Sequence, residues 1–114
     1  MPETLPVMKK SVPSPASGPI MRVEWLRTAL KNIDDEATYL ALENPKAATD
    51  FVKAIFASVE QLSRFPAMGR EGRLSGTREW VLPDRPYLIP YRVRQGKLQV
   101  LRVFHTRRLP PGAW

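Results

Sequence analysis

Apolar residues in the first half of the chain recur at the spacing of amphipathic helices. Between Leu26 and Glu43 they are four, three, four and three residues apart, and a second stripe follows from Ala48 to Leu62. Asn44 suits an N-cap and Pro45 the first helical position, so a second helix is predicted to begin there and to end near Pro66 and Gly69. The short link between the helices predicts an antiparallel hairpin. The stripes comprise Leu26, Leu30, Ile33, Ala37 and Leu40, then Ala48, Phe51 or Val52, Ile55, Val59 and Leu62.

The remaining apolar segments read as strands. "MRVEW" (21–25) precedes the helices, and the period changes to two in "TREWVL" (77–82), "PYLIPYRV" (86–93) and "KLQVLRVFH" (97–105). We therefore expect an α+β fold with an N-terminal strand, a helical hairpin and a three-stranded antiparallel sheet, forming a single domain over residues 21–114.

The turn at Gln95-Gly96 fixes a testable register for the last two strands, because Gly supplies the positive φ of a two-residue hairpin loop. If Arg94 faces Lys97, Arg92 lies beside Gln99. The same register predicts the pairs Tyr91 with Val100, Ile89 with Arg102 and Tyr87 with Phe104 on one face, and Pro90 with Leu101 and Leu88 with Val103 on the other. Pro90 has no N–H for the ladder, which indicates a bulge or an unpaired position there.

Composition and charge narrow the classes of function. The chain has 114 residues, no Cys and one His, which excludes disulfides, Cys-based zinc sites and the usual multi-histidine metal sites. We predict neither a metal nor a cofactor. Residues 1–20 are rich in Pro and Ser and are expected to be a disordered leader. No apolar run is long enough to span a bilayer, and a cytoplasmic location is expected.

The formal net charge of +7 is concentrated in the second half. Residues 64–108 hold eleven Lys or Arg against three acidic residues, a charge of +8, whereas residues 1–63 carry −1. The positive electrostatic field of the second half attracts polyanions or an acidic protein partner. The acidic run Asp34, Asp35 and Glu36 lies largely off the first helical stripe and is interpreted as a solvated helix face.

The order of elements and several local motifs resemble the RelE/ParE superfamily of bacterial toxins. The similarity covers roughly residues 21–110, and its most specific part is "FPAMGREGRLSGTREWVL…PYLIPYRV…LQVLRVFHTRR". The pattern combines a Pro and Gly-Arg loop, a Gly-x-Arg strand entry, a Tyr-Arg strand and a C-terminal "LRVxH" strand. The resemblance implies the toxin of a type II toxin–antitoxin module, neutralised by a cognate antitoxin, ParD-like or RelB-like, in a hetero-oligomer.

The superfamily includes two activities, and the residues favour one of them. Ribonuclease members cut mRNA on the ribosome with an Arg at the position that Leu88 occupies here. His105 matches the C-terminal His of some of these enzymes, but Thr106 stands where they have Tyr. ParE members, whose target is DNA gyrase, generally have an apolar residue at the Leu88 position. The resemblance therefore favours a gyrase inhibitor related to plasmid stabilization systems, with an mRNA endoribonuclease as the alternative.

If the chain does cut RNA, the predicted catalytic candidates are Arg85, His105, Arg107 and Arg108, which the register brings to one end of the sheet where they could hold a phosphate. Arg92 lies too far along the strand from His105 to share that phosphate. Whether the chain is an enzyme at all is left open, and the residues lean against it.

Two interaction surfaces are also predicted. The candidates for binding the target are Arg78, Arg85, Arg92, His105, Arg107 and Arg108. The candidates for anchoring an antitoxin segment on a sheet edge or beside the helical hairpin are Trp25, Trp80, Tyr87 and Phe104, since aromatic residues dominate interface energetics. A basic nucleic-acid-binding module with no toxicity is a third possibility, which would show salt-dependent binding to DNA or RNA.

Overall fold

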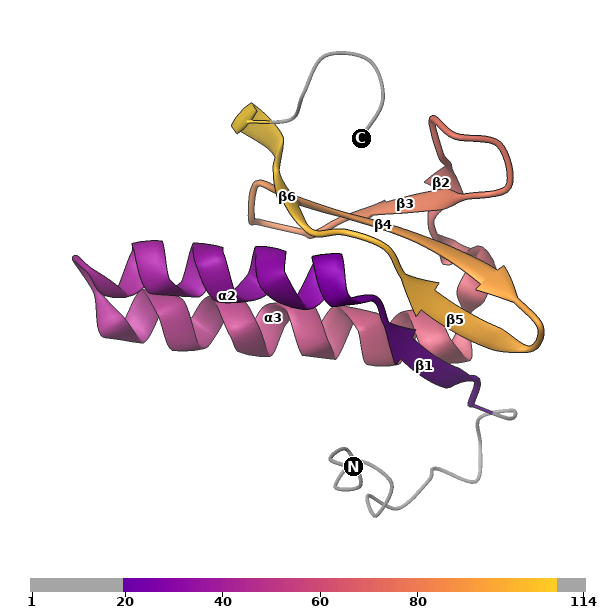
Figure 1. Ribbon diagram of the computed structural model, residues 1–114, viewed down its shortest axis with the longest axis horizontal. Helices are drawn as coiled ribbons and strands as arrows, with labels where there is room; N and C mark the ends of the chain where they lie inside the picture. The colour runs from indigo at the N-terminus through magenta and orange to yellow at the C-terminus, as the bar shows by residue number, and fades with distance from the viewer. Residues whose placement is uncertain (1–19, 109–114) are drawn as a thin grey trace.

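A computed structural model describes residues 20–108 and has two layers, a helical hairpin and a twisted sheet (Figure 1). Of the predicted leader only Ile20 falls within the described residues, so the leader remains untested. The predicted α+β class and the order of its main elements are confirmed. The elements are β1 (Arg22–Trp25), α2 (Arg27–Ala41), α3 (Pro45–Arg64), the 3-10 helix η1 (Pro66–Met68), β2 (Arg70–Glu71), β3 (Arg78–Val81), β4 (Tyr87–Arg94), β5 (Lys97–Val100), β6 (Phe104–His105) and the 3-10 helix η2 (Thr106–Arg108).

The helices form the predicted antiparallel hairpin, and α3 begins where the sequence indicates. The Asn44 side chain accepts hydrogen bonds from the N–H groups of Lys46 and Ala47 at 3.1 and 3.2 Å, and the stripe along α3 is buried. On α2 the predicted stripe is wrong at Leu30, which is 47% exposed, whereas Ala29 is fully buried. The face that α2 turns inward is centred on the side of Ala29 and Ile33, which rotates Leu30 toward solvent.

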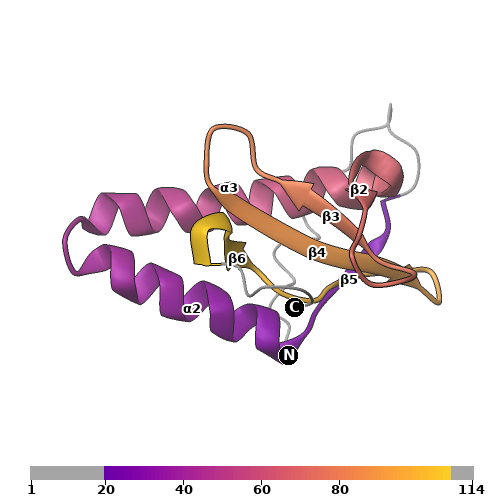
Figure 2. The same ribbon diagram turned by 90° about the horizontal axis from the view of Figure 1, so that it is seen from above.

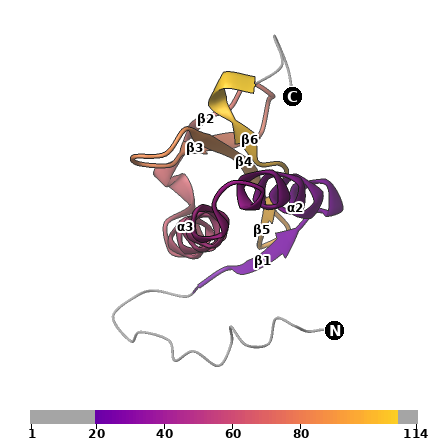
Figure 3. The same ribbon diagram turned by 90° about the vertical axis from the view of Figure 1, so that its left-hand side faces the viewer.

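The sheet has the strand order β1-β5-β4-β3-β2, and β6 continues the pairing along β4. β1 pairs in parallel with β5, with Trp25 beside Val100, a pairing that the sequence did not predict. Seen from above and from the end of the helices, α2 and α3 lie next to each other against one face of the sheet (Figures 2 and 3). The core between the two layers is built from α2, α3 and the helix-facing side chains of β4 and β5, among them Phe51, Ile55, Ile89, Tyr91 and Leu98.

The last strand is interrupted, which corrects half of the predicted register. Between Tyr91–Val100 and Arg94–Lys97 the pairs are those expected. Farther along, Tyr87 pairs with His105 and Leu88 with Phe104, so the predicted pairs Tyr87 with Phe104 and Leu88 with Val103 are wrong by one residue.

The cause of this shift is one extra residue beside Ile89. The Leu101 N–H donates to the Pro90 carbonyl at 2.9 Å, but Pro90 has no N–H with which to extend the ladder. Arg102 and Val103 then occupy the space opposite the single residue Ile89, which is the arrangement of a β-bulge. A shift of one residue exchanges the faces of all side chains beyond it, so Val103 enters the core and His105 joins the face of Tyr87.

A hydrogen bond connects the bulge to α2. The Val103 N–H donates to Oδ1 of Asn32 at 3.1 Å, and Val103 is only 5% exposed. Asn32 therefore supplies the hydrogen-bond acceptor that β4 does not offer to the Val103 N–H. Without this acceptor, the buried N–H would carry the full free-energy cost of its desolvation.

Asn32→Ala is expected to lower the free energy of unfolding by about 1–3 kcal/mol, since it leaves the Val103 N–H unpaired. The matched control is Leu30→Ala on the same helix, where a half-exposed side chain is expected to contribute about 0.5 kcal/mol. Equilibrium unfolding in urea measures both. Equal losses for the two variants would show that Asn32 is not the partner of the bulge.

Candidate functional site

The predicted target-binding residues lie at two ends of the sheet, not in one cluster. Arg85 follows β3, and His105, Arg107 and Arg108 belong to β6 and η2 at the same end. Arg78 begins β3, opposite Tyr91, and Arg92 is the next residue of β4, so both lie toward the other end. In Figure 1 the β3–β4 turn and the loop before β3 mark these opposite ends.

At the first end, the backbone holds His105 beside the β3–β4 turn. The Thr106 N–H donates to the Pro86 carbonyl at 2.8 Å, and the Tyr87 N–H donates to the Arg85 carbonyl at 2.8 Å. The His105 Nδ1 accepts the Arg107 N–H at 3.1 Å. These bonds bring the backbones of Arg85, His105 and Arg107 together as predicted, and Arg108 is the last residue of η2.

The His105 ring nevertheless lies on the helix side of the sheet. It meets the Tyr87 ring edge-on, with 5.2 Å between the ring centroids. The Tyr87 hydroxyl in turn donates to Oε2 of Glu36 on α2 at 2.5 Å. The backbones of the predicted phosphate-binding cluster therefore lie together. The imidazole of His105, however, packs against the Tyr87 ring on the side of α2.

At the second end, both arginines take part in hydrogen bonds within the chain. The Arg78 guanidinium donates to the Gly69 carbonyl at 2.8 Å. The Arg92 Nε donates to Oε1 of Gln99 at 2.6 Å, and the Gln99 amide donates to Glu24 at 2.7 Å. Arg92 thus belongs to a polar row across β4, β5 and β1, beside Gln99 as the register predicted.

The basic loop before β3 is held by two buried polar groups. The Tyr91 hydroxyl accepts the Gly69 N–H at 2.9 Å and donates to the Pro66 carbonyl at 2.6 Å. A Cβ at Gly69 would lie 2.5 Å from the Tyr91 hydroxyl oxygen, so only glycine fits at this close approach. Glu79, which is 2% exposed, accepts the Arg73 N–H at 3.0 Å and the Arg70 guanidinium at 3.3 Å. These contacts give the Gly-Arg motif a structural role.

Burial raises the pKa of the Tyr91 hydroxyl above its ordinary value, and the Gly69 N–H and the charge of Arg78 partly offset this rise. The hydroxyl is therefore more difficult to ionise in the folded chain than in the unfolded chain. Stability from this group is fully present below about pH 10, the ordinary tyrosine pKa, and is lost as the pH rises through the higher folded pKa.

Of the four aromatic residues predicted to anchor an antitoxin, Trp25, Trp80 and Tyr87 contact the core. Trp25 meets Phe56 edge-on at 4.8 Å between ring centroids, and Trp80 packs against the core with a buried indole nitrogen that has no hydrogen-bond partner within the described residues. Tyr87 is only 6% exposed. Phe104 is half-buried, and the Arg102 guanidinium lies 5.5 Å from its ring centroid.

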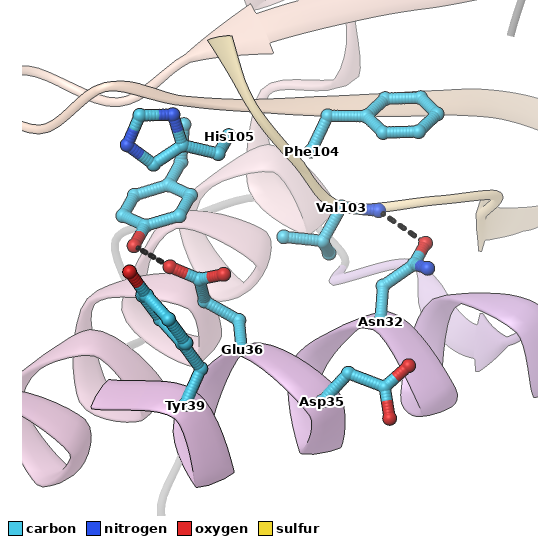
Figure 4. A pocket seen from close by; sticks show the side chains of 8 residues that line it. Asn32, Asp35, Glu36, Tyr39, Val103, Phe104 and His105 are labelled. Carbon is cyan, nitrogen blue, oxygen red and sulfur yellow. Dashed lines mark hydrogen bonds between the residues drawn. The ribbon is translucent and has the colours of Figure 1, made fainter. Parts of the chain in front are cut away.

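A cleft of about 430 Å³ opens between α2 and the bulged end of the sheet (Figure 4). Asn32, Asp35, Glu36 and Tyr39 line it from α2, and Tyr87, Val103, Phe104 and His105 line it from the sheet. The role of Glu36 could not be predicted, because a carboxyl at the edge of a helical stripe gives no local signal for a tyrosine partner 51 residues away. Within residues 20–108 no group of three His or acidic side chains could hold a metal ion.

Comparison with known proteins settles the family to which this architecture belongs. The family described as "ParE toxin of type II toxin-antitoxin system, parDE" matches residues 23–110. "Putative toxin Y4kP" of Sinorhizobium fredii (strain NBRC 101917 / NGR234) is 39% identical over 90 residues, which cover 79% of this chain and 93% of that protein. The chain belongs to the ParE toxin family. It is thus a toxin of the type II toxin–antitoxin class, which confirms the resemblance seen in the sequence.

Solved structures agree with the ParE assignment. The chromosomal ParDE toxin–antitoxin system of P. aeruginosa matches with a TM-score of 0.68 and 28% identity, over 75% of this chain and 96% of that chain. The toxin–antitoxin complex RelBE2 of Mycobacterium tuberculosis shares the fold, with a TM-score of 0.52 and 23% identity, over 76% and 99% of the two chains. In the described part of this ParE toxin, no helix has the length and apolar character needed to cross a membrane.

Tyr91→Phe is expected to lower the free energy of unfolding of this ParE toxin by about 1–3 kcal/mol at neutral pH, because the Gly69 N–H and the Pro66 carbonyl lose their partner. Above about pH 10 the gap to the wild type is expected to narrow, because the variant has no buried hydroxyl to keep protonated. Urea unfolding across pH 7–11 measures both effects. Leu42→Ala, at a side chain that is 78% exposed, is the control and should change stability by no more than about 0.5 kcal/mol at any pH. A gap between Tyr91→Phe and the wild type that widens with pH would contradict the explanation.

Proposed function

We propose that this ParE toxin inhibits DNA gyrase by binding it through a protein surface, and that a cognate antitoxin neutralises the toxin by direct binding. The observation that carries the proposal is the state of Leu88. This side chain is 1% exposed and sits in β4 opposite Phe104, at the position where the resemblance places the catalytic Arg of the ribonuclease members. A buried leucine can neither stabilise charge on a phosphate nor transfer a proton.

The surface proposed to meet gyrase is the basic end that carries Arg85 and Arg107. Arg78 and Arg92 are less suited to this role, because their guanidinium groups already bond to Gly69 and Gln99 within the chain. Arg107 is exposed at the end of the sheet and Arg85 is half-buried beside it. A positive surface of this kind raises the rate at which an acidic protein partner associates.

The proposed antitoxin is supported by the solved relatives, which are toxin–antitoxin systems of the ParDE and RelBE kinds. We propose a ParD-like antitoxin, because the ParE family covers most of this chain. The half-buried rings of Trp25, Trp80 and Phe104 remain proposed anchors for it, whereas Tyr87 is buried in the core. Cytoplasmic action follows from the proposed target.

The test is to express the full chain from an inducible promoter in bacteria without its antitoxin, and to compare plasmid supercoiling with the integrity of ribosome-bound mRNA soon after growth stops. The proposal expects altered supercoiling or cleaved DNA together with intact mRNA. Cut mRNA with normal supercoiling would overturn it in favour of the ribonuclease alternative, which the proximity of Arg85 and His105 along the backbone would then explain.

Paired charge variants locate the surface. The double variant Arg85→Gln with Arg107→Gln is expected to reduce gyrase inhibition by about tenfold or more, because it removes two positive charges from the proposed interface. The control is Arg22→Gln with Arg94→Gln, which removes the same charge from two exposed strand positions elsewhere and is expected to leave inhibition within about twofold. Equal losses in the two double variants would mean that only the net charge matters.

A further inference from the structure

The cleft between α2 and the bulged end of the sheet differs in charge from the rest of the protein. The chain carries +7 overall, yet the described residues that line this cleft include Asp35 and Glu36 and neither Lys nor Arg. Asp35 is exposed at the rim, and Glu36 lies deeper, where it accepts the Tyr87 hydroxyl. An acidic recess in a basic protein selects for a cationic occupant and disfavours an anionic one.

Aromatic walls add a second requirement on the occupant. Tyr39 lines the cleft and is 60% exposed, and His105 lines it from the sheet (Figure 4). The His105 ring meets the Tyr87 ring edge-on. The faces of such rings attract a cation, and a planar guanidinium can stack on them while it also bonds to a carboxylate. A volume of about 430 Å³ is enough for one side chain and its stem.

We propose that this cleft binds one arginine side chain of a peptide partner, with the guanidinium at the rim, where Asp35 and Tyr39 lie four residues apart on α2. A metal ion is disfavoured as the occupant because, within residues 20–108, no group of three His or acidic residues has suitable geometry. This site adjoins the basic surface proposed for gyrase through His105, which accepts the Arg107 N–H, but its test does not depend on toxicity.

Lys31 competes for the same carboxyl. Its Nζ lies 3.0 Å from Asp35, but the two side chains are 72% and 60% exposed, and exposed pairs one helical turn apart are weak. An incoming guanidinium that also stacks on Tyr39 can displace Lys31. Removal of the lysine charge should therefore strengthen binding, and removal of the aspartate charge should weaken it.

The test is an NMR titration of the full chain with N-acetyl-arginine methylamide, and with the citrulline analogue, which keeps the shape of the side chain but lacks its charge. We expect saturable shift changes confined to residues 31–39, Tyr87 and residues 103–105, with affinity about tenfold lower for the citrulline probe. Equal affinity for the two probes, or no saturable change at these residues, would overturn the proposal.

Variants of adjacent acidic residues supply the control for net charge. Asp35→Asn is expected to weaken arginine binding by about fivefold and Tyr39→Ala by a similar factor, while Lys31→Gln strengthens it. Asp34→Asn makes the same charge change at the neighbouring exposed position, which does not line the cleft, and should leave affinity within about twofold. If Asp34→Asn and Asp35→Asn have equal effects, the arginine responds only to the overall field and the site does not exist.

Discussion

The hydrogen bond from the Val103 N–H to Asn32 is the contact on which the functional end of the molecule depends. Pro90 cannot continue the ladder of β4, and one extra residue enters the neighbouring strand at this point. Asn32 satisfies the amide that the sheet leaves without a partner and so fixes the bulge to α2. Without that bulge, the side chains that follow it would point to the opposite faces of the sheet.

The consequences of this shift reach both proposed surfaces. Val103 fills the core, and His105 meets Tyr87 and not the outer face, so the one histidine of the chain is removed from the solvent side where a phosphate would approach the arginines. The same shift places Val103 and His105 in the lining of the cleft, together with Glu36. Next to His105, the guanidinium of Arg107 remains exposed, and its positive charge suits recognition of a protein surface better than proton transfer. Leu88, buried at the centre, is consistent with that division.

Much of the fold could be predicted from local patterns, because caps and hairpin turns depend on neighbouring residues. Asn44 and Pro45 located the start of α3, and Gln95-Gly96 fixed the Arg92–Gln99 pair. The parallel pairing of β1 with β5 had no local signal, since it joins residues more than 70 positions apart. Leu30 was misplaced because helical spacing gives the width of a stripe but not its rotation against the sheet.

The candidate site was harder to predict because its contacts join elements that are distant in the sequence. Glu36 was interpreted as part of a solvated acidic run, but its carboxyl accepts a hydrogen bond from the Tyr87 hydroxyl. Pro90 correctly indicated a bulge, although the sequence could not show on which strand the extra residue would lie. That choice depends on Asn32, whose amide offers an acceptor only after α2 has packed against the sheet.

The most direct test of this account is the identity of the residue opposite Tyr87 in solution. Directly opposed residues in antiparallel strands approach closely at the backbone, so through-space NMR contacts between α protons or between an α proton and an amide identify them. The account predicts contacts between Tyr87 and His105, together with a slowly exchanging Val103 amide. Contacts between Tyr87 and Phe104 would contradict it, because His105 would then face away from α2 and neither the cleft nor the proposed separation of the histidine from the arginines would exist.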